Sequence, residues 1–385
     1  MGRAVNGRMT REGKASMGLR QAAVRYWSSA IAGRAGGFWG AVLRTLLSTL
    51  SYGYGASVKL RNLLYDRQLW MFKTVRLPVA VVSVGNIAIG GTGKTPFVAL
   101  LARRLEALGR EPCILSRGYG PTREAAQNDE YLMLRELLPR VPHLVGKERL
   151  LTGLQAILQF HPQVLILDDG FQHRKLARNL DIVLVDALQP LGLGHLLPRG
   201  RLREPAGELR RADLICLTHS DLVERRRLEE VRERVRRLAP AVPILEAQHQ
   251  PRRLRPVLPL GEGQPPEMLA RKRAAVFCAL GSPESFVAEV RRLGAEVVHQ
   301  ALFPDHHRPS GPELERLFAD ARSAQADLLV CTHKDAVKLP RDLLPPIPIL
   351  ALEMELVILR GEEQLEKALG GLPAPTSLKQ YELRL

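Results

Sequence analysis

Apolar and polar residues occur in short blocks along the chain, and from residue 67 onward the blocks alternate between strand and helix patterns. Helical periodicity separates most of the apolar runs and is clearest over residues 95–108. A further helical pattern covers residues 221–238, where apolar side chains repeat on one face. Strands that alternate with helices predict an α/β fold with a doubly wound parallel sheet. The runs that predict its buried strands are 79–84, 113–116, 164–167, 182–185 and 214–217.

The segment before the first strand has a different pattern. Residues 1–34 are rich in arginine, glycine and alanine, which predicts a disordered basic arm or an unused upstream start. Residues 35–58 contain one charged residue, Arg44, and serine and glycine make this stretch too polar to span a bilayer. We expect an amphipathic helix in the membrane interface, with packing against the next domain as the alternative. Its apolar positions at helical spacing are Phe38, Trp39, Val42, Leu43, Leu46, Leu47 and Leu50.

A second, smaller α/β domain is predicted near the C-terminus. Residues 249–266 hold five prolines and several arginines, which predicts a loose linker before it. After the linker, strands at 274–280, 297–300, 328–332 and 347–352 alternate with helices at 283–293 and 311–323. The expected division is therefore a basic arm at 1–34, a helical segment at 35–66, a first α/β domain at 67–248, a linker at 249–270, and a second α/β domain at 271–385 whose C-terminal tail can pack back on the first.

Composition adds one strong signal, a formal net charge of +16 over 385 residues. A charge of this size favours an acidic partner, such as nucleic acid, an anionic membrane surface or a phosphorylated substrate. Nucleic-acid binding would call for aromatic side chains among the basic ones, but aromatic residues make up only 5% of the chain. The four cysteines are far apart and lack metal-ligand spacing, which indicates buried free thiols in a reducing compartment.

A glycine-rich loop lies between the first predicted strand and the helix that follows it. Residues 81–96 read VVSVGNIAIGGTGKTP and match a phosphate-binding loop, except that Ala88 stands where the commonest form has glycine. In such loops backbone N–H groups surround the phosphates, Lys94 neutralises the β- and γ-phosphates, and the Thr95 hydroxyl binds Mg²⁺. The predicted nucleotide-binding positions are Ala88, Ile89, Gly90, Gly91, Thr92, Gly93, Lys94 and Thr95.

Two acidic residues, Asp168 and Asp169, directly follow the predicted strand at 164–167. They should emerge at the carboxyl edge of the sheet, where open α/β folds bind ligands. One carboxylate can hold a hydrated Mg²⁺ and the other can orient it or the acceptor, and a helix N-cap is the alternative for Asp169. A GTPase usually recognises guanine through an Asn/Thr-Lys-x-Asp element. Residues 332–335 are the nearest stretch but have the wrong spacing, which argues against a GTPase.

Six segments, in this order, resemble those of the tetraacyldisaccharide 4′-kinases, the lipid A 4′-kinases. They are SVGNIAIGGTGKTP, SRGYG, LDDGFQHRKLARNLDIVLVDA, LLPRGRLREP, FPDHH and THKDAVKL, and the resemblance covers residues 52–352. It implies a P-loop, ATP-dependent kinase at the cytoplasmic face of a bacterial inner membrane. The implied acceptor is the 4′-hydroxyl of an acylated glucosamine disaccharide 1-phosphate, and the implied partners are this glycolipid and the anionic membrane surface, with no nucleic acid. The alternatives are a P-loop ATPase acting on nucleic acid and a soluble small-molecule kinase.

The resemblance also implies roles for residues outside the loop. Asp129, in the string QNDEY, takes the proton of the 4′-hydroxyl, and His306 orients it. Arg149 meets nucleotide phosphate oxygens, Arg203 binds the transferred or substrate phosphate, and Glu204 faces the metal. The implied catalytic residues are Asp129, His306, Lys94 and Arg203. The implied metal ligands are Thr95, Asp168, Asp169 and Glu204.

Several neighbouring positions complete this expectation. Gln172 and His173 are implied to line the same site. Three residues depart from the family pattern: Asn128 replaces a glycine before Asp129, Arg199 stands where a small residue is common, and His333 replaces a glutamate. These departures concern local contacts and leave the implied reaction unchanged.

Overall fold

A computed structural model describes residues 37–69, 71–118, 129–258, 261–280, 283–305, 307–340 and 342–376. The expected basic arm at 1–34, Asn128 and His306 lie outside these residues. The described strands form one 11-stranded sheet in the order β3-β2-β4-β1-β5-β6-β7-β11-β10-β8-β9. Neighbouring strands are parallel on both sides of a single antiparallel pair, β7 with β11. The predicted α/β class with a doubly wound sheet is confirmed.

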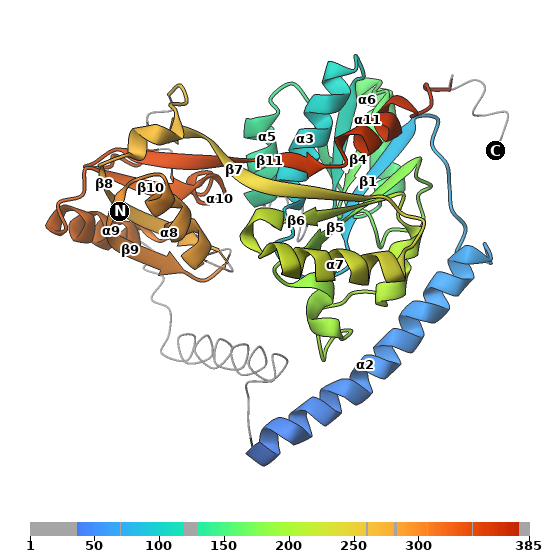
Figure 1. The fold of residues 1–385 in the computed structure, drawn as a ribbon. Coiled ribbons are helices and arrows are strands. Elements are labelled where there is room, and N and C mark those ends of the chain that lie inside the picture. The colour runs from blue at the N-terminus through green and yellow to red at the C-terminus, as the bar shows by residue number, and fades with distance from the viewer. Residues whose placement is uncertain are drawn as a thin grey trace, which may run out of the picture.

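The first lobe is the larger half of the sheet and carries helices on both faces (Figure 1). Buried aliphatic residues of β1, β4 and β5 pack against Phe97, Val98 and Leu101 of α3, which forms one of the main cores. The strands are β1 (Ala80–Asn86), β2 (Pro112–Ser116), β3 (His143–Val145), β4 (Val164–Asp168), β5 (Leu180–Asp186) and β6 (Leu214–Thr218). The helices are α3 (Lys94–Ala107), α5 (Asp129–Leu137), α6 (Arg149–Phe160) and α7 (Arg225–Leu238), with 3-10 turns at Pro190–Gly194, Ala206–Arg211 and Ser220–Leu222.

The second lobe is a smaller α/β unit at the other end of the sheet (Figure 1). Its helices cover the two faces of the strands in two separate apolar clusters. Helix α9 begins with a capping box in which Ser310 and Glu313 satisfy each other's backbone N–H groups. The elements are β8 (Arg273–Ala279), α8 (Pro283–Arg292), β9 (Glu296–Phe303), α9 (Gly311–Ser323), β10 (Leu328–Thr332) and α10 (His333–Ala336), preceded by a 3-10 turn at Pro266–Leu269.

Two long strands, β7 (Ile244–Pro256) and β11 (Ile349–Arg360), run between the lobes (Figure 1). The expectation of a loose linker from residue 249 is therefore wrong up to Pro256. Proline is tolerated there because the register shifts next to Pro251, opposite Met354, and because Pro256 is the last residue of the strand. After β11 the chain adds α11 (Glu362–Gly370), and apolar residues from both elements join the first-lobe core around Phe97.

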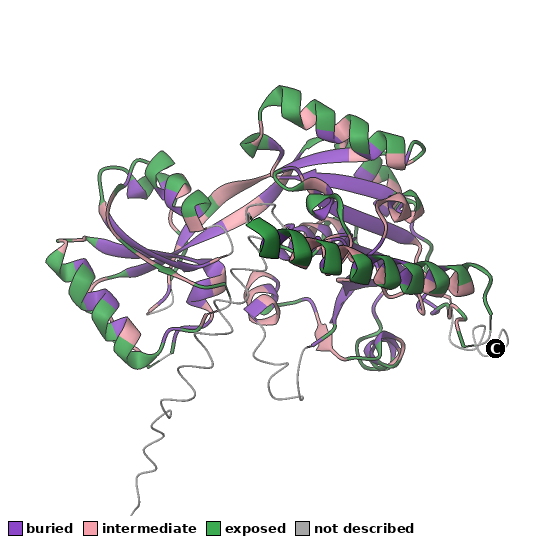
Figure 2. Cartoon of the chain, turned by 90° about the horizontal axis from the view of Figure 1, so that it is seen from below, coloured by how far each residue is buried: buried purple, intermediate pink, exposed green. Residues whose placement is uncertain are grey.

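Helix α2 (Gly37–Asp66) lies along the edge of the first lobe and is exposed over much of its length (Figures 1 and 2). Its buried face consists mainly of small and polar residues, which are Gly40, Leu47, Ser51, Gly55, Val58 and Asn62. Large apolar side chains instead point away from the described residues: Trp39 is 74% exposed, Leu46 56% and Leu50 53%. The helix thus packs mainly through small and polar residues, and most of its apolar stripe is exposed, although Leu47 of that stripe is buried. No helix among the described residues is long and apolar enough to cross a membrane.

Candidate active site

The glycine-rich loop joins the end of β1 to the start of α3, as the sequence predicts. Gly93 has a φ of 77°, and a Cβ at this position would lie 2.7 Å from the ring of His249 on β7, so only glycine fits. The Asn86 side chain donates to the Thr92 hydroxyl at 3.1 Å and braces the loop from beneath. Ala88 packs into the apolar cluster that contains Leu202. A methyl group is thus accommodated where the commonest loop has glycine.

Lys94 and the acidic pair at the end of β4 lie together at the carboxyl edge of the sheet. The Nζ atom of Lys94 is 3.8 Å from Oδ1 of Asp169. Asp169 has a φ of 56°, a left-handed conformation that turns the chain sharply after the strand. Arg203 binds both carboxylate oxygens of Asp169, at 2.7 and 2.9 Å. The loop, the acidic pair and the string LREP therefore meet in one cluster.

Arg203 reaches this cluster because its segment pairs with the loop. Its backbone N–H donates to Ile87 O at 2.8 Å, and Ile89 N–H donates to Arg201 O at 2.8 Å. The guanidinium also donates to Gln172 Oε1 at 2.9 Å. Gln172 thereby lies in the cluster, as expected from its position in the string DDGFQHR.

The two neighbouring carboxyls have different electrostatic environments. Burial raises the pKa of Asp168 to about 6, and the charge of Glu130 acts in the same direction. Burial alone would also raise the pKa of Asp169, but hydrogen bonds from Arg203 and the charge of Lys94 hold it below its usual value. At neutral pH Asp169 is thus firmly ionised, whereas Asp168 is poised to respond to a nearby cation.

A buried hydrogen-bonded chain that the sequence did not predict supports Asp168. Ser116, the first residue of the string SRGYG, donates from Oγ to Asp168 Oδ2 at 3.1 Å. Its Oγ also lies 2.8 Å from Nε2 of His143, and burial lowers the pKa of His143 to about 3. His143 comes from the short strand β3, which no pattern in the sequence predicted.

Arg149 lies buried beside the acidic pair at the end of β4. It is 2% exposed, and its guanidinium donates to Asp168 O at 2.9 Å and to Gly146 O at 3.0 Å. These contacts hold the end of β4, so Arg149 positions the acidic pair. His173 is half-buried nearby, and burial lowers its pKa to about 4, which keeps its ring neutral.

Glu204 does not fit the implied role of metal ligand. It is fully buried, and its two carboxylate oxygens are bound by Arg61 of α2 and by Arg211. A carboxylate with both oxygens in buried ion pairs has no oxygen directed to a metal. Glu204 stands at the position that the family string LREP predicts. Its side chain, however, joins α2 to the loop that carries Arg203.

The proposed base Asp129 lies at the boundary between the lobes. It is the first residue of α5, it is 9% exposed, and its Oδ2 is 3.7 Å from Nζ of Lys338 in the second lobe. At the other end of α5, Glu136 contacts Nε2 of His333 at 2.9 Å. His333, the departure from the usual glutamate, thus pairs with an acidic partner on the first lobe. The position of His306 lies outside the described residues.

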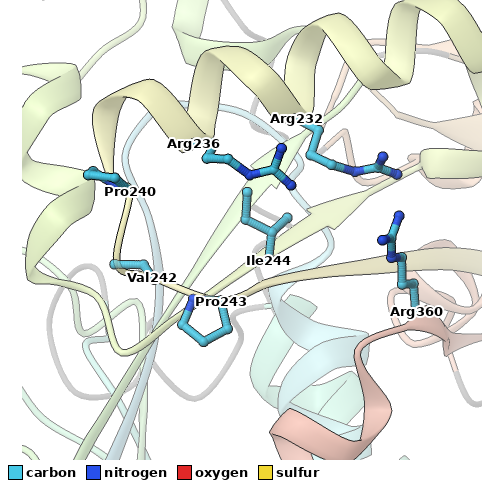
Figure 3. Close-up of a pocket in the computed structure, with 7 residues that line it drawn as sticks. All are labelled: Arg232, Arg236, Pro240, Val242, Pro243, Ile244 and Arg360. Atoms are coloured by element: carbon cyan, nitrogen blue, oxygen red, sulfur yellow. The ribbon is translucent and has the colours of Figure 1, made fainter.

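A cavity of about 160 Å³ lies elsewhere, between α7 and the ends of β7 and β11 (Figure 3). The side chains of Arg232, Arg236 and Arg360 point toward this space (Figure 3). Because Ile244 begins β7, which runs parallel to β6, the cavity is at the amino edge of the sheet, opposite the glycine-rich loop. It does not belong to the candidate active site.

Comparisons with known proteins agree with this geometry. The profile of the tetraacyldisaccharide-1-P 4′-kinase family matches residues 43–372. A tetraacyldisaccharide 4′-kinase of Syntrophus aciditrophicus (strain SB) is 41% identical, over 83% of this chain and 91% of that protein. One from Anaeromyxobacter sp. (strain K) is 40% identical, over 82% and 87%.

A solved structure is also similar. The crystal structure of LpxK from Aquifex aeolicus in complex with ATP superposes with a TM-score of 0.67 at 32% identity, and the match covers 85% of this chain and 98% of that one. These similarities extend over both lobes and favour a kinase over a nucleic-acid ATPase. The chain belongs to the tetraacyldisaccharide-1-P 4′-kinase family and is a phosphotransferase of lipid A biosynthesis.

Proposed function

We propose that this chain transfers the γ-phosphate of ATP to the 4′-hydroxyl of a tetraacylated glucosamine disaccharide 1-phosphate. The observation that carries the proposal is the single cluster formed by Lys94, Asp169 and Arg203 at the glycine-rich loop. Two cations beside the start of a helix suit the triphosphate of ATP, since both the ammonium and the helix amino end attract phosphate. Family membership supports the disaccharide as the acceptor.

In the proposed reaction, the 4′ oxygen attacks the γ-phosphorus while Asp129 accepts the hydroxyl proton. The bond between the γ-phosphorus and the bridging oxygen breaks, and ADP leaves with its electron pair. Lys94 and Arg203 neutralise the charge that builds up on the transferred group. His306 orients Asp129, and positioning with charge neutralisation supplies most of the rate enhancement, as is usual for phosphoryl transfer.

Magnesium suits the oxygen donors of this site. Mg²⁺ prefers one or two carboxylates together with water and substrate phosphates. The carboxylates of Asp168 and Asp169 and the hydroxyl of Thr95, the second residue of α3, are such donors. In the described part of the chain, no three acidic, histidine or cysteine side chains are grouped so that they could hold a metal ion by themselves. When bound there, Mg²⁺ neutralises charge on the β- and γ-phosphates. The poised carboxyl of Asp168 fits this role because a nearby cation favours its ionised form.

Transfer of labelled phosphate tests the proposed function directly. Purified protein is incubated with ATP labelled at the γ-phosphate and with three additions, the disaccharide 1-phosphate, a nucleoside and DNA. We expect label on the glycolipid alone, and no stimulation of ATP hydrolysis by DNA. A disaccharide blocked at the 4′ oxygen is the matched control and should stay unlabelled. Label on the nucleoside, or on the blocked glycolipid, contradicts the proposal.

We further propose that the first lobe binds the nucleotide. We also propose that the enzyme works at the cytoplasmic face of the inner membrane, with α2 lying in the membrane interface. The apolar stripe of α2, with Trp39, Leu46 and Leu50 exposed, supports this proposal. Apolar side chains that enter the headgroup boundary bind more strongly next to basic residues and anionic lipids. The high positive charge of the chain favours the same surface.

Vesicle co-sedimentation of the full chain tests the membrane role. We expect Leu46→Glu to weaken binding to vesicles containing anionic phospholipid by about tenfold or more, because it removes one buried aliphatic side chain and adds a charge. Thr45→Glu is the matched control, since Thr45 is also exposed but lies off the stripe, and it should bind nearly as well as wild type. Equal loss in the two variants, or no loss in either, contradicts a role for the stripe.

A further inference from the structure

A buried lysine, Lys338, lies where the two lobes meet. Its side chain is 1% exposed, and its Nζ atom is 2.7 Å from Oδ1 of Asp335 and 3.7 Å from Oδ2 of Asp129. The same ammonium donates to His307 O at 3.0 Å. One cation therefore contacts a second-lobe carboxylate, the proposed base on the first lobe, and the backbone of the residue that follows His306.

A structural pairing with Asp335 alone does not account for this arrangement. Asp335 is already held in place, because its Oδ2 accepts from Thr332 Oγ1 at 2.6 Å and from Ala279 N at 3.1 Å. These contacts aim the other oxygen at Lys338. Burying an ammonium is costly unless all its protons find partners, and the three contacts above come from three separate segments.

Among the described residues, carboxylates lie near Asp129 as well as the ammonium of Lys338. Glu130 follows it on α5, and Asp335 lies on the far side of Lys338. Glu136, at the other end of α5, is taken up by His333 and Arg255. In this neighbourhood the ammonium of Lys338 favours the ionised form of Asp129, since an opposite charge within about 4–6 Å stabilises a carboxylate.

We propose that Lys338 is a positioning residue for the base: it keeps Asp129 ionised and aligned when the second lobe sits against α5. The inference rests on the proposed role of Asp129 in the kinase reaction. Lys338 acts through Asp129 and through the His307 backbone, and it does not itself contact the reacting atoms. The string THKDAVKL thus contributes a residue to the site from the second lobe.

The pH profile of turnover tests this role. We expect Lys338→Met to lower kcat, to leave the KM for ATP nearly unchanged, and to move the acid limb of kcat/KM for the glycolipid to higher pH by about one unit or more. Lys338→Arg keeps the charge and should keep the limb near its wild-type position. Because phosphate groups of both substrates titrate in the same range, each limb is compared with wild type and not with an absolute value.

The matched control is Asp335→Asn, which removes the other carboxylate partner of Lys338. We expect it to lower thermal stability without moving the acid limb to higher pH, because the pair between Lys338 and Asp129 remains. A limb that stays at its wild-type position in folded Lys338→Met overturns the inference. If the methionine variant does not fold, a limb that moves to higher pH in Asp335→Asn overturns it instead. If the wild-type protein does not transfer phosphate to the glycolipid, the proposed function itself is refuted. That outcome differs from a failure of the inference about Lys338, in which wild-type transfer is normal.

Discussion

Replacement of Lys94 by methionine is expected to lower kcat/KM for ATP by about 10³-fold, while the protein remains folded. Lys94 is a cation of the first lobe. It opens α3, and its Nζ atom is 3.8 Å from Asp169 Oδ1. Methionine keeps the length of the side chain but cannot neutralise charge on the leaving β-phosphate or the transferred group. The loss should therefore appear mainly in kcat, because that charge grows in the transition state.

The measurement is steady-state transfer of labelled phosphate to the disaccharide, together with thermal denaturation. Lys367→Met is a matched control, since Lys367 is an exposed lysine in the last turn of α11, and it should retain wild-type turnover. A loss of less than tenfold in Lys94→Met would place the phosphates away from the glycine-rich loop.

Asp129→Asn is expected to lower kcat by about 10²–10⁴-fold with little change in the KM for ATP. Asparagine matches the shape of aspartate but cannot take a proton from the 4′-hydroxyl. Asp129 is 9% exposed, and its contact with Lys338 is an ion pair that asparagine weakens, so denaturation curves accompany the kinetics.

Glu130→Gln is the informative comparison for this base. It changes the next carboxylate in the string QNDEY, and we expect a much smaller loss than in Asp129→Asn. A large loss in Glu130→Gln with near-normal turnover in Asp129→Asn would assign the base to Glu130. In an Asp129→Asn background, Lys338→Met should add little, because the two residues act as one unit.

Most of the sheet could be predicted because its strands are buried runs of apolar residues. The strands β1, β2, β4, β5, β6, β8 and β10 are buried along nearly their whole length. β3 could not be predicted, because it has three residues and each is only half-buried. Strand β7 could not be predicted beyond residue 248, because its prolines are typical of a linker. Its pairing with β11 depends on a register shift, which no local sequence pattern reveals.

The candidate site divides in the same way. Lys94, Thr95, Asp168 and Asp169 were predictable because each ends or directly follows a strand, or opens a helix, at the carboxyl edge of the sheet. The ion pairs of Glu204 were not, because one partner, Arg61, is 143 positions away in sequence. The outward direction of most of the α2 stripe agrees with the expected helix in the membrane interface, but the pattern alone left packing against the next domain as an alternative, since a helical pattern identifies a face but not what that face contacts.

The contact between α2 and the loop at Arg203 has a consequence for how substrate is supplied. Tyr54 donates to Arg203 O at 2.8 Å, and it lies four residues, about one helical turn, after Leu50 of the exposed stripe. A helix with its side chains is roughly 10–12 Å across, so an enzyme resting on its stripe would hold Arg203 within about one helix diameter of the lipid. The acyl chains could then remain in the bilayer while only the sugar is lifted. Turnover would follow the density of glycolipid in the plane of the membrane, and the enzyme could move from one molecule to the next without detaching.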